Sequence, residues 1–151
     1  MSRIVLRHAR RDDAEKLLAW RNDPETRAAS RSTAPVVEED HRGWLDHVLA
    51  DPTRILLVAE ADGGEAIGQA RFDGDGVGFE ISISLSPSAR GKGLGAELIR
   101  AACDWLGAEE PDAPVCAWVR SDNPSSLAAF ETAGFQSDDL ASEDFVRLSR
   151  S

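Results

Sequence analysis

The chain has 151 residues, of which 42% are hydrophobic and 29% are charged, and its formal net charge is −10. This composition is typical of a soluble globular domain that buries about 70% of the surface of its unfolded chain. It disfavours nucleic-acid binding, which leaves a basic footprint, and no apolar stretch approaches the roughly 20 residues of a membrane-spanning helix.

The first third of the chain is predicted to be helical after one short strand. A strand at residues 4–8 precedes a helix that starts at Asp12 or Asp13, with a stripe of Ala14, Leu17, Leu18 and Arg21. Pro24 can open a second short helix. A third helix is predicted for residues 38–50, with a stripe formed by His41, Trp44, Leu45 and Val48. We expect the tryptophan of this stripe to lie in the core.

Turns rich in glycine and aspartate divide the middle of the chain into three strands. They separate residues 54–61, 66–72 and 77–86, which we predict to form an antiparallel meander. A helix at residues 94–107 and a strand at residues 115–120 follow. Because a whole helix crosses between them, the strands at 77–86 and 115–120 must run parallel to each other.

The end of the chain adds a helix and a hairpin. The helix starts at residues 123–125 and ends at Gly134, and residues 135–136 and 145–148 supply the last two strands. The predicted fold class is therefore α+β, with a mixed and mostly antiparallel sheet and one parallel crossover at its centre. We expect residues 1–151 to form a single domain.

A glycine-rich run, Arg90-Gly91-Lys92-Gly93-Leu94-Gly95, follows the third strand of the meander. Glycines let backbone N–H groups close around phosphate oxygens, the first turn of the next helix presents unpaired donors, and the arginine and lysine add positive charge. The run therefore predicts a pyrophosphate-binding turn. A glycine-rich turn with solvated cations would have the same sequence and is the alternative.

Two other phosphate motifs fit this run less well. The P-loop pattern GxxxxGK[ST] fails because Ser86 stands where its first glycine belongs and a glycine follows the lysine. The dinucleotide pattern GxGxxG/A fits as Gly91, Gly93 and Ala96, which leaves a fragment of a dinucleotide-binding oxidoreductase as an alternative. That pattern turns almost directly from strand to helix, whereas residues 87–90 intervene here.

The cysteines and histidines do not indicate a special site. Cys103 and Cys116 lie inside a predicted helix and a predicted strand, where we expect small core residues rather than a disulfide or a catalytic thiol. The three histidines are too scattered to form a metal site, and no CxxC or HExxH spacing occurs. Residues 1–11 lack the apolar core of a signal peptide, which favours a cytoplasmic location.

Positive charge is concentrated near the N-terminus. Residues 1–31 hold eight Arg or Lys against five Asp or Glu, whereas residues 32–151 hold nine against twenty-two. Together with the glycine-rich run, this basic part could attract an anionic substrate. It could equally be a solvated face without a partner.

Two motifs, at matching separation, carry a resemblance to a known family. The first is Arg90-x-x-Gly93-x-Gly95 after a strand; the second comprises Asn123, Ser126, Phe130, Gly134 and Phe135. With this order of strands and helices, the chain resembles, over nearly its full length, the GNAT superfamily of acetyl-CoA-dependent N-acetyltransferases. The resemblance implies that the two parallel strands splay apart at a bulge and open a slot for acetyl-CoA, the cosubstrate.

The resemblance also implies which residues bind the cosubstrate. Main-chain groups of residues 83–85 would bond the pantetheine as if it were another strand, and the turn at residues 90–96 would hold the pyrophosphate. The implied set is Ile83, Ser84, Leu85, Arg90, Gly91, Lys92, Gly93, Leu94, Gly95, Ala96, Asn123, Ser126 and Phe130.

For catalysis, the resemblance implies direct attack of a primary amine on the acetyl thioester. The Leu85 N–H would stabilise the oxyanion, and Glu80 would accept the proton of the amine, directly or through water, unless it is a structural carboxylate. Many relatives carry tyrosine at the position of Phe130 to protonate the thiolate, but this chain contains no tyrosine. Ser126, Ser84 or water would then be the acid, or the protein would be a non-catalytic module that binds acyl-CoA.

The acceptor side is implied by residues 20–27 and 39–45, which are similar to the opening of a family branch that acetylates amino-sugar nucleotides. A small-molecule amine of that kind is the expected partner. Ribosomal-protein N-terminal acetyltransferases share a version of this opening, so a protein N-terminus is the alternative acceptor. The implied acceptor-binding residues are Arg21, Asn22, Arg27, His41 and Glu80.

Two further expectations concern this N-terminal part and the assembly. Arg21 could instead be a cation at the C-terminal end of its helix, with Asn22 as the cap. A homodimer made by exposed edge strands is also expected.

Overall fold

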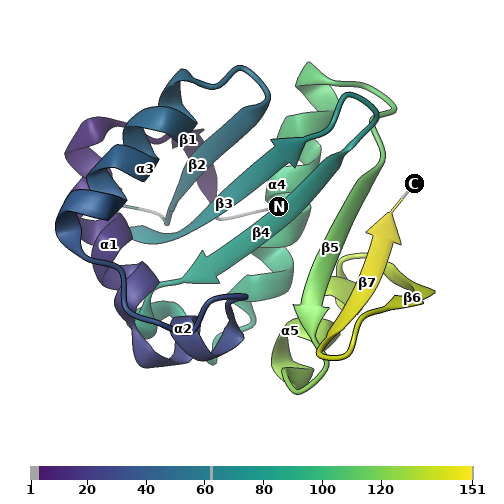
Figure 1. The fold of residues 1–151 in the computed structure, drawn as a ribbon. Coiled ribbons are helices and arrows are strands. Elements are labelled where there is room, and N and C mark those ends of the chain that lie inside the picture. Colours follow the sequence, from purple (N-terminus) through teal and green to yellow (C-terminus); the bar gives the residue numbers. More distant parts are fainter. Residues whose placement is uncertain (1–3, 62, 151) are drawn as a thin grey trace.

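The protein is built on one mixed sheet of seven strands, as the sequence predicts (Figure 1). The structure is a computed structural model and describes residues 4–61 and 63–150. The strand order is β1-β2-β3-β4-β5-β7-β6, in which β4 and β5 are parallel and the other neighbours antiparallel. The strands are β1 (Val5–His8), β2 (Arg54–Glu60), β3 (Ala66–Gly74), β4 (Phe79–Leu85), β5 (Val115–Arg120), β6 (Gln136–Ala141) and β7 (Phe145–Arg150).

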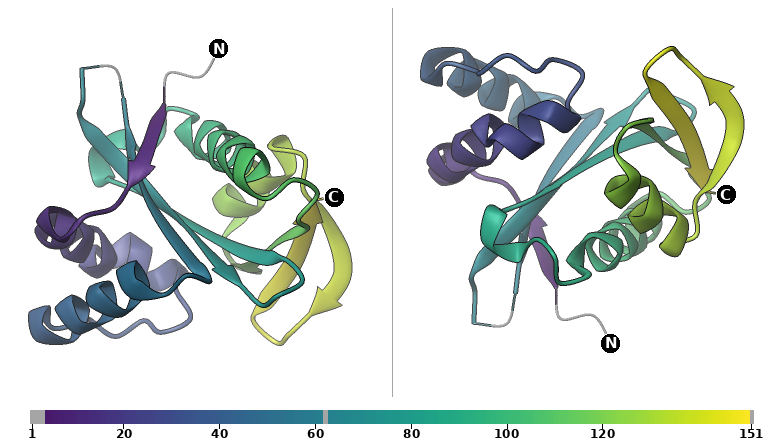
Figure 2. Two further views of the ribbon diagram at one scale, coloured as in Figure 1. Left: turned by 90° about the horizontal axis from the view of Figure 1, so that it is seen from above. Right: turned by 90° about the horizontal axis from the view of Figure 1, so that it is seen from below.

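Helices cover both faces of the sheet. Figure 2 shows α1, α2 and α3 on one side and α4 and α5 on the other. Within the described ranges, no helix is long and apolar enough to cross a membrane. The helices are α1 (Ala14–Asn22), α2 (Pro24–Ala29), α3 (Glu38–Ala50), α4 (Leu94–Glu109) and α5 (Pro124–Thr132), with short 3₁₀ turns η1 (Arg11–Asp13) and η2 (Pro87–Ala89).

Two apolar clusters hold these helices to the sheet, and β2 contributes to both. Leu57 packs in the larger cluster, with residues of α4 and α5, while Leu56 and Val58 pack in the smaller one, with residues of α1 and α3. All three are at most 3% exposed. Side chains of a strand alternate between its faces, so a central strand covered on both sides must be apolar throughout.

The core position expected for Trp44 is wrong, and the stripe expected for α1 differs from the residues that the structure buries. In α1 the buried residues are Leu17 and Trp20, whereas Arg21 lies at the edge of the packed face. In α3, Trp44 is only partly buried. Its ring lies beneath the guanidinium groups of Arg71 and Arg54, at 5.6 and 6.0 Å from the ring centroid, instead of inside the apolar cluster.

The parallel strands β4 and β5 stay paired only at their beginning. Their register contains Phe79–Val115 and Glu80–Cys116, and no further pairing between them occurs in the described chain. Beyond this point the two strands diverge, which Figure 1 shows as a widening gap. The expected bulge does not appear as a register shift, because β4 follows β3 in unbroken register along its whole length. β5 likewise follows β7, so each strand keeps to its own antiparallel partner.

Replacing Gly68 with Ala tests how tightly β3 holds the end of β4. A Cβ at this position would lie 2.5 Å from Ser84 O and 3.3 Å from Leu85 Cα, so the strands must shift. We expect G68A to lose about 1–3 kcal/mol of unfolding free energy, measured by urea denaturation. The control is G43A in α3, where a Cβ meets nothing within 4 Å and should add up to about 1 kcal/mol. Equal stability of the two variants would contradict this packing.

Candidate active site

A cavity of about 910 Å³ lies where β4 and β5 separate. The diverging parts of both strands line it, together with the start of α4, α5 and, from the opposite face, α1, α2, α3 and the loop between α2 and α3. Most of the predicted site residues border it, namely Arg21, His41, Glu80, Ile83, Ser84, Leu85, Arg90, Gly91, Gly93, Leu94, Gly95, Asn123, Ser126 and Phe130. Four do not, namely Asn22, Arg27, Lys92 and Ala96.

Backbone amides of β4 face the cavity at two predicted positions. Ser86 N donates to Ile67 O on β3 at 2.8 Å, and Phe79 N donates to Pro114 O, ahead of β5, at 2.9 Å. Successive residues of a strand direct their backbone groups to alternate edges. The amides of Ile83 and Leu85 therefore point to the edge that β5 leaves open, whereas the backbone of Ser84 faces β3. The expectation of main-chain bonding by Ser84 is wrong for this reason, and its side chain alone borders the cavity.

The glycine-rich turn leads from β4 into α4 through two left-handed residues. Gly91 has φ +75° and Gly93, the N-cap residue of α4, has φ +73°. Nothing lies within 4 Å of a Cβ placed on either one, so their backbone is approachable. Gly95 lies against α5 instead, where its Cβ would meet Ala129 Cβ at 3.4 Å. The amides at the start of α4 remain the strongest candidates for a pyrophosphate site.

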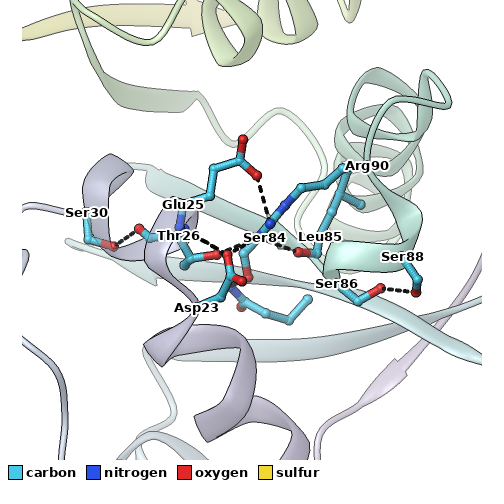
Figure 3. A network of polar contacts seen from close by, with 10 residues as sticks. Asp23, Glu25, Thr26, Ser30, Ser84, Leu85, Ser86, Ser88 and Arg90 are labelled. Atoms are coloured by element: carbon cyan, nitrogen blue, oxygen red, sulfur yellow. Dashed lines mark hydrogen bonds and ion pairs between the residues drawn. The ribbon is translucent and has the colours of Figure 1, made fainter.

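Arg90 directs its guanidinium away from this turn and toward α2 (Figure 3). Nη2 donates to Asp23 Oδ2 at 2.7 Å and to Thr26 Oγ1 at 3.0 Å, and Nη1 lies 2.7 Å from Glu25 Oε2. Nη2 also approaches the Leu85 carbonyl oxygen at 3.4 Å. The guanidinium, followed by backbone amides of α2, holds the pKa of Asp23 below its usual value. The predicted pyrophosphate role of Arg90 thus conflicts with partners that already occupy its side chain.

Glu80 lies at the fork where the parallel strands part. It is paired with Cys116 in the last register position of β4 and β5, and its carboxylate borders the cavity. Arg31, from the loop after α2, donates Nη2 to Glu80 Oε2 at 3.0 Å. Further along the same face of β4, Gln69 Nε2 donates to Ser84 Oγ at 2.9 Å. A carboxylate at this position can accept a proton from a group in the cavity once the Arg31 guanidinium no longer donates to it.

Of the three predicted residues around α5, Asn123 caps the helix, Phe130 packs in the core and Ser126 is half-buried beside the cavity. Asn123 caps α5, accepting a hydrogen bond from Ser126 N on its Oδ1 at 3.2 Å. Phe130 is 3% exposed and packs edge-to-face on Phe135, with 5.1 Å between ring centroids. Ser126 is half-buried and borders the cavity. Of these side chains, the Ser126 hydroxyl is the one that can donate a proton from this wall.

Of the predicted acceptor-side residues on α1, α2 and α3, Arg21 and His41 border the cavity, whereas Asn22 and Arg27 do not. Asn22 bonds both backbone groups of Val36 at 2.7 Å, and Arg27 Nε donates to Thr33 O at 3.0 Å. Both side chains therefore shape the loop after α2. The alternative role of Asn22 as the C-terminal cap of α1 is also wrong, because Asn22 is the last residue of α1 and Asp23 is its C-cap residue.

His41 is buried and Arg21 is partly buried, and both have unused hydrogen-bonding capacity. Arg21 Nη2 donates to Ser32 O at 3.0 Å, while its Nη1 and His41 Nδ1 are buried without a partner among the described residues. Burial, and then the charges of Arg27 and Arg71, lower the pKa of Arg21. Burial and the charge of Arg21 likewise lower the pKa of His41, which is 4% exposed.

Sequence reasoning missed several lining residues. Arg71 and Gln69 alternate on the cavity face of β3, a pattern that the alternation of polar and apolar residues in 66–72 could have revealed. Arg31 and Arg120 reach the cavity only through the tertiary fold: both Arg120 Nε and Nη2 donate to Ser30 O, at 3.0 and 2.7 Å. Across the described ranges, no group of three His, Cys, Asp or Glu residues is arranged to hold a metal ion.

The sequence profile of the Acetyltransferase (GNAT) domain family matches residues 3–136. The chain belongs to the GNAT acetyltransferase family. A curated relative, mycothiol acetyltransferase of Nocardioides sp., is 37% identical over 60 residues, which cover 40% of this chain and 19% of the relative. The chain therefore matches about a fifth of the length of that relative.

Solved structures of other GNAT proteins share the fold. Spermidine N-acetyltransferase from Vibrio cholerae, in complex with CoA and spermine, superposes with a TM-score of 0.88 at 18% identity over 98% of this chain and 95% of that one. AAC(6')-Ib in complex with paromomycin and acetyl-CoA has a TM-score of 0.84 at 24% identity, over 98% and 93% of the two chains. A domain from Methanocaldococcus jannaschii has a TM-score of 0.85 at 20% identity over 99% of both.

Replacing Arg90 with Gln tests which partner its guanidinium serves. We expect R90Q to lose about 1–2 kcal/mol of unfolding free energy at pH 7, because Asp23 loses a charged donor. The folded pKa of Asp23 lies below the unfolded value of about 3.9, so the pair stabilises above that pH. The difference between wild type and variant should shrink as the pH falls through the folded pKa, in urea titrations at pH 7 and pH 3.

Lys92→Gln is the matched control, because Lys92 is exposed and lies on the same turn. K92Q should keep the stability of the wild type. If R90Q kept full stability and lost CoA affinity instead, the side chain would serve the pyrophosphate after all.

Proposed function

We propose that this GNAT protein transfers the acetyl group of acetyl-CoA to a primary amine of a small molecule by direct attack. The observation that carries the proposal is the open edge of β4, where the Ile83 and Leu85 amides face a cavity that also contains Glu80 and the start of α4. Relatives with this fold bind CoA or acetyl-CoA next to amine compounds, spermine and paromomycin.

On the donor side, β4 and α4 provide the contacts. The unpaired amides of Ile83 and Leu85 bond the pantetheine in place of a neighbouring strand. Backbone N–H groups of residues 91–96 bind the pyrophosphate, with Lys92 adding charge at the exposed rim. Arg90 contributes by holding the turn to α2. Asn123 contributes by capping α5 and so fixing where this helix begins, and Phe130 packs in the core behind the α5 side of the cavity.

The chemistry requires a base, an oxyanion donor and an acid. Glu80 removes a proton from the ammonium group of the acceptor, directly or through water, and the neutral amine then attacks the acetyl carbon to form the C–N bond. The Leu85 N–H stabilises the negative charge on the acetyl oxygen. Oxyanion donors of this kind contribute several kcal/mol in the enzymes where their effect has been measured. As the C–S bond breaks, Ser126 or water protonates the leaving thiolate, which is a fair leaving group with a reference pKa of about 8.5.

An amino-sugar nucleotide is the proposed acceptor class. The cavity is bordered by five arginines, although the whole chain carries a net charge of −10, and this contrast supports an acceptor with phosphate groups. The two free cysteines are compatible with a cytoplasmic protein.

A non-catalytic acyl-CoA-binding module is the second candidate. It is favoured by the core position of Phe130, which leaves this wall without the tyrosine acid of many relatives.

Glu80→Gln tests the proposed base. We expect E80Q to lower kcat by about 10²- to 10⁴-fold, because the amine loses its base, while CoA affinity stays unchanged. Thiol release measures turnover, and calorimetry measures CoA binding. The control is E109Q, at the exposed end of α4, which should match the wild type.

The wild-type result decides between enzyme and module. Binding of CoA without thiol release, across amino sugars, polyamines and peptide N-termini, would support the module and contradict the proposed activity.

A further inference from the structure

We infer that the acceptor carries an anionic group, and that Arg71 and Arg21 bind it at the end of the cavity between β3, α1 and α3. This inference rests on the proposed function, whose acceptor it describes more closely. It assigns a subsite for phosphate or carboxylate oxygens, separate from the turn at the start of α4.

The charges that border the cavity do not cancel. Five arginines and three carboxylates line it: Arg21, Arg31, Arg71, Arg90 and Arg120 against Glu25, Asp40 and Glu80. Two arginines form ion pairs with carboxylates of this set: Nη1 of Arg90 lies 2.7 Å from Glu25, and Nη2 of Arg31 lies 3.0 Å from Glu80. What remains is three arginines against one aspartate. A surplus of positive charge inside an acidic protein indicates an anionic ligand.

Arg21 is the most poorly compensated of these cations. No carboxylate of the described chain forms an ion pair with it, and the carbonyl of Ser32 is its hydrogen-bond partner. Its Nη1 is buried without a partner, and the neighbouring charges that lower its pKa are those of other arginines. Burying an uncompensated charge costs free energy, which an anion would recover on binding.

Arg71 presents its guanidinium to the same end of the cavity. Its Nε donates to Asp73 Oδ2 at 3.1 Å, but Asp73 also pairs with Arg54 at 2.8 Å, so one carboxylate serves two arginines. The Arg71 side chain is 26% exposed, and its Nη atoms have no partner within the described residues. Two free Nη donors in a plane match the oxygens of a phosphate or carboxylate.

Trp44 and His41 complete the subsite from α3. The Trp44 ring lies 5.6 Å from the Arg71 guanidinium carbon and 5.4 Å from the His41 ring. The Trp44 face fixes the direction of Arg71. His41 Nδ1 is buried without a partner, borders the same cavity and offers a further polar atom.

This subsite disfavours polycationic acceptors, such as the spermine bound in one structure with the same fold. A polyamine placed between Arg21 and Arg71 would meet like charges with one nearby carboxylate, Asp40, to offset them. Like-charge contacts select against such partners even when the amine itself fits the reaction.

Matched acceptors test the inference. Thiol release is measured with acetyl-CoA and glucosamine, glucosamine 1-phosphate, UDP-glucosamine, β-alanine or spermidine. We expect kcat/KM to rise about 10- to 100-fold from the free sugar to its phosphorylated forms, and spermidine to be the poorest acceptor. The phosphorylated sugars and β-alanine separate a phosphate from a carboxylate preference.

Arg71 variants show whether this residue carries the preference. R71Q should lower kcat/KM for the phosphorylated sugars, through KM, by a larger factor than for glucosamine, and R71K should restore part of the difference. The control is R42Q, on the exposed face of α3, where Arg42 pairs with Glu38 and does not border the cavity. Thermal unfolding verifies that each variant is folded.

The outcomes separate this inference from the proposed function. Acetylation of spermidine as fast as of the phosphorylated sugars, with R71Q unchanged, would overturn the anion subsite and leave the transferase intact. If no amine is acetylated, the transferase fails, and calorimetric binding of UDP-glucosamine to the CoA-saturated protein decides the subsite. Binding that R71Q weakens would support the subsite; no binding, or binding that R71Q does not weaken, would overturn it.

Discussion

Backbone hydrogen bonds that β4 cannot make with β5 are the constraint around which the molecule is arranged. Buried N–H and C=O groups require partners, and a central strand normally finds them on both edges. β4 finds them on β3 along its length but on β5 only at Phe79 and Glu80. The Ile83 and Leu85 amides therefore face a cavity. Leaving them unpaired costs free energy in the protein without ligand, but it lets them bond an extended ligand that is rich in amide groups.

The segment from α2 to α3 encloses this open edge, and arginines hold it there. Arg90 joins it to the end of β4, Arg31 joins it to the beginning of β4, and Arg120 joins it to β5. Figure 1 shows α2 beside the gap between the two strands. The same segment therefore supplies one wall of the proposed acceptor site and stabilises the diverging strands, so changes in it should affect both stability and acceptor binding.

Local patterns predicted most of the fold, because they depend on neighbours in sequence. The turns of Gly and Asp, the starts of α2 and α5, and the need for a parallel crossover around α4 were predicted from local residue patterns alone. The side-chain partners of Arg90 were not, since Asp23 is 67 residues away and nothing local favours it over a phosphate. Trp44 was misplaced for a similar reason: the arginines of β2 and β3 that lie on its ring come from other elements.

The central claim is that the open edge of β4 binds CoA through its backbone. Amide hydrogen exchange with and without CoA tests this most directly, since each amide is its own probe. The account predicts that CoA slows exchange at Ile83 and Leu85, while Ser86, already bonded to Ile67 O at 2.8 Å, stays unchanged. CoA that binds but leaves the Ile83 and Leu85 amides exchanging at their original rates would contradict it.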